Sequence, residues 1–261
     1  MRVKATQVSK DSQVRSIARK LLTAGLVAGL VAALSGIPAT AGTSTNAEIT
    51  DAAGDANFIS VASADQRDTR PASVDNVDLR AVWFETSYTT VKIIDSTGAV
   101  SRVEYRPTAL LVRIQTQAPV RPSSPWGARR YKVQAAVPTC QASFELLAAA
   151  DAANDIAELR PATANTLCGD DVSFVVSPVK PTYDGAVVTL TFPLAHPKIS
   201  QVISSGTTLS QSNAFVTANL GPGPMLPTVD QTGAGRDFTI GQDVPADIDC
   251  NSTPSNPECQ P

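Results

Sequence analysis

Leu79-Arg80-Ala81-Val82-Trp83-Phe84, together with the residues that follow it, is the stretch that decides the fold of this chain. Its side chains alternate between two faces, which is the two-residue period of a β-strand. Residues 89–95 extend the pattern, Asp95-Ser96-Thr97-Gly98 has the composition of a turn, and residues 99–105 run back. The pattern therefore predicts an antiparallel hairpin with Trp83 packed in the core.

Further short segments of the same kind follow this hairpin and predict about ten strands in all. These segments are residues 109–116, 131–137, 142–147, 156–160, 172–176, 186–192, 214–218 and 237–240. The alanine-rich residues 148–153 would also suit a short helix on propensity alone. We favour a strand, a turn at Asn154-Asp155 and a returning strand. Gly, Pro and Asp turns between short strands predict an all-β fold, a two-sheet antiparallel β-sandwich of jelly-roll or Ig-like form.

Residues 1–41 have the order of a signal peptide. Six basic residues precede an uncharged run at residues 21–34, and Ala39-Thr40-Ala41 provides the small side chains of a cleavage site. An uncleaved membrane anchor is the alternative, but it needs about 20 apolar residues, more than this run supplies. The sequence thus predicts a secreted, extracellular protein with a signal peptide at 1–41, a β-sandwich domain at 42–242 and a disulfide-closed C-terminal tail at 243–261.

The charge of the exported part limits its partners. Residues 1–41 contain six of the 21 Lys and Arg residues and one of the 24 acids, which leaves the rest of the chain with a net charge near −8. Nucleic acid and anionic membrane surfaces both require a basic face. We therefore expect neither as a partner after cleavage. An extracellular glycan or a protein partner, and the oligomeric state, stay open.

Four cysteines lie in the exported part, and an even number in an oxidising compartment predicts disulfides. Three pairings are possible, and proximity in the sequence favours Cys140 with Cys168 and Cys250 with Cys259. A metal cluster would need closer spacing and usually histidine. His196 is the only histidine of the chain, so we favour disulfides over a metal.

Four segments carry a resemblance to a known group of domains. They are residues 49–56 (ITDAAGDA), 77–82 (VDLRAV), 184–193 (DGAVVTLTFP) and 230–238 (DQTGAGRDF). Together they resemble secreted β-sandwiches related to family-nine carbohydrate-binding modules and DOMON domains, although Ala52 stands where those domains often have proline. The resemblance implies a non-catalytic accessory module, calcium-stabilised or sugar-binding in some of its members.

The aspartates of the first segment make a separate physical case for calcium. Asp51 and Asp55 flank Gly54, which permits a tight turn that directs two carboxylates toward one hard cation, and Asp78 at a strand start completes the set. An ordinary turn before a strand is the alternative explanation. The predicted cofactor is therefore a calcium ion held by Asp51, Asp55 and Asp78, or none.

A sugar-binding site needs an exposed aromatic ring against which a sugar stacks. Trp126 follows the proline-rich residues 119–125 and is the best candidate for that role.

A Ser-His-Asp hydrolase would have to use His196, and the chain has no Gly-x-Ser-x-Gly motif. The sequence predicts a non-catalytic binding module whose first candidate ligand is carbohydrate. The alternatives are a structural or surface-interaction protein without a small ligand, and an extracellular hydrolase.

Overall fold

A computed structural model describes residues 47–53, 56, 78–120, 129–137, 142–150, 156–161, 175–218 and 228–260. The chain divides into two compact units, Met1–Ser35 and Gly36–Pro261, and every described residue belongs to the second. The predicted signal peptide thus lies outside the described residues. Within them, no helix has the length and apolar character that crossing a membrane requires.

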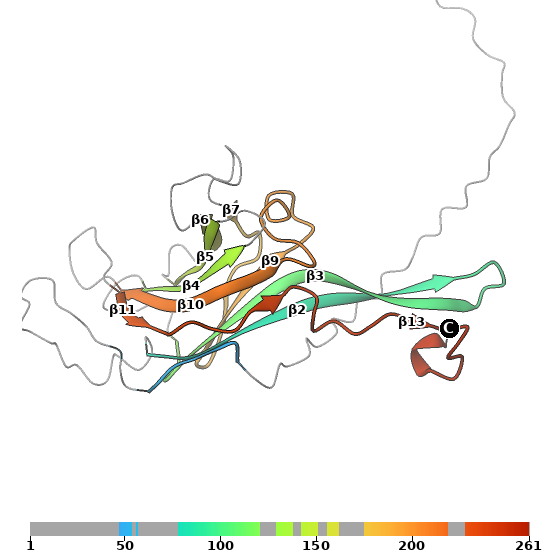
Figure 1. Ribbon diagram of the computed structural model, residues 1–261, viewed down its shortest axis with the longest axis horizontal. Coiled ribbons are helices and arrows are strands. Elements are labelled where there is room, and N and C mark those ends of the chain that lie inside the picture. Colours follow the sequence, from blue (N-terminus) through green and yellow to red (C-terminus); the bar gives the residue numbers. More distant parts are fainter. Residues whose placement is uncertain are drawn as a thin grey trace, which may run out of the picture. The chain divides into compact units, whose positions relative to one another are not determined.

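Two antiparallel sheets make up the described structure (Figure 1). The first sheet has the order β1-β2-β3-β9-β8, and β13 pairs with β3. Its strands are β1 (Ile49–Thr50), β2 (Leu79–Ile94), β3 (Val100–Thr116), β8 (Thr182–Asp184), β9 (Val187–Pro193) and β13 (Ile248–Asp249). The second sheet has the order β11-β10-β4-β5-β6-β7, and β12 pairs with β10. Its strands are β4 (Arg129–Val137), β5 (Ala142–Ala150), β6 (Ile156–Pro161), β7 (Val175–Val176), β10 (Thr208–Ala218), β11 (Thr228–Gln231) and β12 (Phe238–Thr239).

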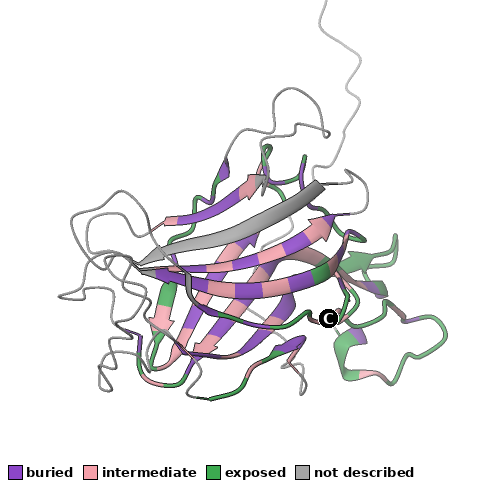
Figure 2. Cartoon of the chain, turned by 60° about the vertical axis from the view of Figure 1, so that its left-hand side comes forward, coloured by how far each residue is buried: buried purple, intermediate pink, exposed green. Residues whose placement is uncertain are grey.

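Side chains from both sheets join one hydrophobic cluster. Phe84 and Leu110 come from the first sheet, and Tyr131 and Val133 from the second, and none of the four has any exposed surface. Burial of one such side chain stabilises the fold by about 1.5–3 kcal/mol. Buried and partly exposed residues alternate along the strands (Figure 2), as the two-residue period predicts. The all-β, antiparallel prediction is confirmed.

The predicted hairpin is present but longer than the sequence indicated. β2 and β3 are continuous strands of 16 and 17 residues. The sequence predicted separate strands at 99–105 and 109–116, whereas β3 runs through Pro107 because the ladder shifts there: Ser87 pairs with Ala109 and Tyr88 with Pro107. Such a bulge accommodates a proline that a regular ladder would exclude.

Trp83 is not a core residue, so that prediction is wrong. Its side chain is half-buried, whereas Val82 and Phe84 on either side are completely buried. The pairing register shifts between Leu79 and Ala81, which moves the alternation by one residue after Leu79. A two-residue period identifies two faces, but a shift of this kind changes which of them faces the core.

The ambiguous residues after 142 form strands. β5 pairs with β6 in antiparallel fashion, from Phe144 opposite Pro161 to Ala149 opposite Ile156. The strand, turn and strand interpretation is therefore confirmed for the described parts of this segment. Tertiary pairing of this kind overrides the helical propensity of a short alanine run.

The C-terminal residues pack beside the far half of the hairpin. β13 pairs with β3, and the 3₁₀ turn η1 (Pro257–Cys259) follows it. The Cys250–Cys259 disulfide is present, with the two Cα atoms 5.5 Å apart, so this predicted pairing is confirmed. Both cysteines join Val100 and Val103 in a second, smaller hydrophobic cluster. Cys140 and Cys168 lie outside the residues that the structure describes.

Candidate functional site

Two of the three predicted calcium ligands lie near the start of β2. The backbone N–H of Asp51 donates to the carbonyl oxygen of Arg80 over 3.0 Å, and Asp78, only 1% exposed, directly precedes the strand. Asp55 lies outside the described residues. Among the residues that are described, no group of three or more His, Cys, Asp and Glu side chains is placed to hold a metal ion.

A third carboxylate near the start of β2 was not predicted. The Asp230 carboxylate, on β11 of the second sheet, accepts a hydrogen bond of 2.5 Å from the backbone N–H of Leu79. This buried bond joins two residues that are 151 positions apart and links the second sheet to the first. The turn-like sequence around Asp230 contains no signal for such a long-range contact.

Two further carboxylates bond the edge of β2 just beyond its pairing with β1. Glu48 Oε2 accepts from the backbone N–H of Phe84 over 2.9 Å, and Asp243 Oδ2 accepts from that of Thr86 over 2.7 Å. Burial raises the pKa of Glu48, against the opposing effect of the Phe84 hydrogen bond. The two side chains therefore cap backbone donors with which no described strand pairs.

Glu85 lies between those two positions and is almost completely buried. Its carboxylate forms an ion pair of 3.0 Å with Arg113 on the neighbouring strand β3. Burial raises the pKa of Glu85 and Arg113 opposes that effect, while Asp243 and Glu48 raise the pKa further. The carboxylates around this edge therefore repel one another, which is a structural arrangement and not by itself a binding site.

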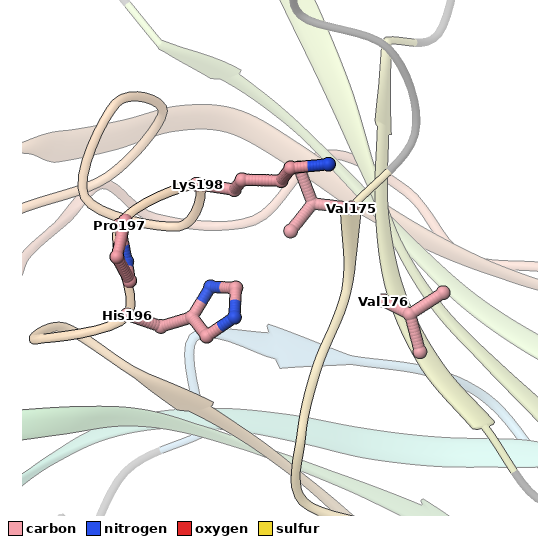
Figure 3. A pocket seen from close by; sticks show the side chains of 5 residues that line it. All are labelled: Val175, Val176, His196, Pro197 and Lys198. Carbon is pink, nitrogen blue, oxygen red and sulfur yellow. The ribbon is translucent and has the colours of Figure 1, made fainter. Parts of the chain in front are cut away.

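The only histidine of the chain lines a pocket. Residues 193–200 form a turn in which the N–H of His196 donates to the oxygen of Pro193, and that of Ser200 to the oxygen of His196. A pocket of about 450 Å³ opens between this turn and β7 (Figure 3). Its described lining consists of Val175, Val176, His196, Pro197 and Lys198.

The pocket combines an apolar wall with basic groups. Val176 is 41% exposed although valine is apolar, and Lys198 is exposed. In Figure 3 the imidazole of His196 faces the valines and the chain of Lys198 extends toward Val175. Most small-ligand sites combine a largely apolar wall with a few polar groups in this way. The arrangement suits a small ligand that has both an apolar surface and a negative charge.

The surroundings of His196 bear on the hydrolase alternative. Nδ1 of His196 is buried and forms no hydrogen bond with the described part of the chain. The hydroxyl of Ser200, one turn away, donates to the carbonyl oxygen of Pro197 over 3.1 Å. A Ser-His-Asp site needs a carboxylate bonded to one imidazole nitrogen and a serine hydroxyl bonded to the other. Neither hydrogen bond is present among the described residues.

Trp126, the predicted stacking platform, lies outside the residues that the structure describes. The pocket itself could not be predicted, because Val175 and His196 belong to separate segments whose approach depends on tertiary packing. The single signal available was the uniqueness of His196. Comparisons of this chain with protein families, with curated proteins and with solved structures found no match.

Proposed function

We propose that residues 42–261 form an exported, non-catalytic β-sandwich that binds a carbohydrate bearing a carboxylate. The observation that carries the proposal is the pocket between β7 and the turn at residues 193–200, where two basic side chains lie beside an apolar wall. Two antiparallel sheets with one common hydrophobic cluster support the sandwich. The leader-like residues 1–41 support export.

The chemistry of the pocket selects the ligand class. The apolar face of a sugar ring can pack against Val176 and Pro197, while its carboxylate pairs with the ammonium of Lys198. The imidazole of His196 can donate to the same carboxylate when protonated, or to a sugar hydroxyl when neutral. The overall negative charge of the exported chain makes this basic pocket a local exception that favours an anionic group over a neutral one.

Calcium is the second part of the proposal. Asp51 and Asp78 lie near the start of β2, and with Asp55 they would provide oxygen ligands for one stabilising ion. The ion would have no role in chemistry. It would hold the segment before β2 against the sheet.

Calorimetric titration with a panel of neutral oligosaccharides and uronic-acid oligosaccharides tests the ligand class. We expect binding of acidic members only, with at least tenfold weaker binding after Lys198→Gln and a smaller loss after His196→Ala. Lys92→Gln is the matched control, because it removes an equal charge from the hairpin, where Lys92 contacts the carbonyl of Gln260. No binding by any member would refute the binding-module proposal. Binding that is lost with Trp126→Ala but kept in both pocket variants would move the site to the Trp126 loop.

A further inference from the structure

Within the described residues, the outer edge of β2 is capped up to Thr86 and open beyond it. Along the capped part, the carbonyl oxygens of Arg80 and Val82 accept from Asp51 and Glu48, and the N–H groups of Phe84 and Thr86 donate to carboxylates. Even-numbered residues therefore direct their backbone groups away from β3. Two shifts in the pairing register follow Ala81, one after Ser87 and one after Ile93, and in both the extra residue lies on β3. Backbone groups of β2 therefore continue to alternate in direction to the end of the strand.

Residues 88–94 are the open edge. The alternation directs the backbone groups of Tyr88, Thr90 and Lys92 outward, and within the described residues no strand, side chain or loop bonds them. The other edge of the hairpin differs, because β13 pairs with β3 there (Figure 1). Extended backbone with a free row of donors and acceptors is a template for pairing with another strand.

The side chains of the open edge favour pairing as well. Residues 89–94 (TTVKII) are mostly β-branched, contain no Pro or Gly, and carry one charge, on Lys92. Ile93 and Ile94 are 36% and 41% exposed, which places both among the exposed large hydrophobic residues of the described structure. Protein edges are usually blunted by proline, bulges or several charges. This edge has only Lys92, whose ammonium is already bonded to the oxygen of Gln260.

We propose that two copies of this chain pair through their open edges, antiparallel, about a two-fold axis at Val91. An antiparallel pair of identical strands presents the same surface on both sides and closes on itself as a dimer. Residues whose backbone N–H and C=O groups point away from β3 must lie opposite residues of the same kind in the second copy, because these groups form the new ladder. This condition places Thr90 opposite Lys92 of the second copy and Tyr88 opposite Ile94. On the other face, Val91 meets Val91 of the second copy and Ile93 covers Thr89.

In each of the two neighbouring registers, a group of the strand conflicts with the pairing. An axis at Lys92 would place the two ammonium groups directly opposite each other, and like charges in that position are destabilising. An axis at Thr90 would require the N–H of Thr86 to pair with Ile94, but the Asp243 carboxylate already accepts from that N–H. The axis at Val91 avoids both conflicts and covers both exposed isoleucines.

Cysteine cross-linking tests the register. Val91 would occupy a non-hydrogen-bonded position opposite itself, with Cα atoms about 4.5 Å apart, which lies within the range of a disulfide. We expect Val91→Cys to form a disulfide-linked dimer under mild oxidation. Ile93→Cys is the matched control, since Ile93 is exposed but lies opposite Thr89 and four residues away from its own copy. Equal cross-linking of the two variants, or none with Val91→Cys, overturns the proposal.

Sedimentation equilibrium of the purified protein tests association itself. We expect a monomer–dimer equilibrium, weakened at least tenfold by Val91→Lys and unaffected by Val179→Lys, which adds the same charge at a residue that is 37% exposed outside the hairpin. The thermal midpoint of dilute samples of the two variants should be equal, which separates lost pairing from lost folding. A monomer at every concentration, or open-ended aggregation in place of a dimer, would refute the inference.

Discussion

Among the described glycines, Gly235 has the least room for a side chain. A Cβ atom there would lie 2.5 Å from Ile49 Cγ1 and 2.9 Å from the carbonyl oxygen of Glu48. That oxygen cannot move away easily, because it accepts from the N–H of Arg236 over 2.9 Å. We expect Gly235→Ala to lower the free energy of unfolding by about 1–3 kcal/mol, the usual cost of overpacking.

Urea unfolding measures that loss, and Gly233→Ala is its control. No atom lies within 4 Å of the position that a Cβ would take on Gly233, so this variant should change stability by less than about 0.5 kcal/mol. Equal stability of the two variants would contradict the close approach of Gly235 to Ile49 and Glu48.

Glu48 should contribute more to stability as the pH falls, whereas most carboxylates of folded proteins contribute less. Burial raises its pKa above 4.5, so the folded chain binds this proton more tightly than the unfolded chain does. Its contribution to stability therefore grows as the pH falls through the raised pKa toward 4.5, and it is lost as the pH rises through that pKa. Glu48→Gln removes the titration but keeps an oxygen that can accept from Phe84.

Urea unfolding of wild type and Glu48→Gln at pH 7 and pH 5 tests this sign. We expect the wild type to gain stability relative to the variant at the lower pH. Comparing the two proteins at each pH is necessary because the pKa values of Asp95 and Asp247 are lowered by hydrogen bonds, and these groups lose stability on acidification. A relative loss by the wild type would mean that Glu48 is stabilised as a charge.

Among the elements, the C-terminal tail is the one whose stability can be separated from the rest. Its cysteines belong to the smaller hydrophobic cluster, apart from the core that the two sheets have in common. Closing a loop of about ten residues by a disulfide contributes about 3 kcal/mol in the chain-entropy model. We expect Cys250→Ser with Cys259→Ser to abolish hydrogen-exchange protection at Cys250 and Tyr105, whose amides bond across to Ser101 and Asp247.

The main thermal midpoint of that double variant should change little, because the large core does not include the tail. A fall of the midpoint together with the exchange protection would instead make the tail part of one cooperative unit. The result also bears on self-association, since the tail lies against the hairpin that carries the open edge.

Individual strands were the features of the molecule that the sequence predicted best. Period-two patterns located the hairpin and β9, because alternation depends only on neighbouring residues. They failed where a bulge intervened: the shift after Leu79 reversed the expected face of Trp83, and the shift beside Pro107 joined two expected strands into one. A bulge depends on the partner strand, which a local pattern does not contain.

At the scale of the whole molecule, contacts between distant segments decide the site. The bond from Leu79 to Asp230 and the approach of Val176 to His196 both join separate parts of the chain. Composition made His196 conspicuous as the only histidine, and cysteine spacing predicted the Cys250–Cys259 disulfide. Neither could reveal the pocket or the open edge, because each requires knowledge of which strands pair and where that pairing stops.

The proposed calcium site would depend on the whole folded molecule, because its three predicted ligands come from both sides of a long intervening segment. An ion that binds only the folded state at 100 times its dissociation constant adds about 2.7 kcal/mol to stability. For a domain of this size each kcal/mol shifts the thermal midpoint by about 2–4 °C, so the midpoint should rise by about 5–11 °C between excess chelator and millimolar calcium. Asp51→Ala and Asp55→Ala should each abolish the rise, whereas Glu258→Ala, an exposed carboxylate of the tail, should preserve it. An unchanged midpoint would reduce the segment at residues 51–55 to an ordinary turn. A rise that persists in both variants would place the ion elsewhere, with Asp230 near the start of β2 as the next carboxylate to replace.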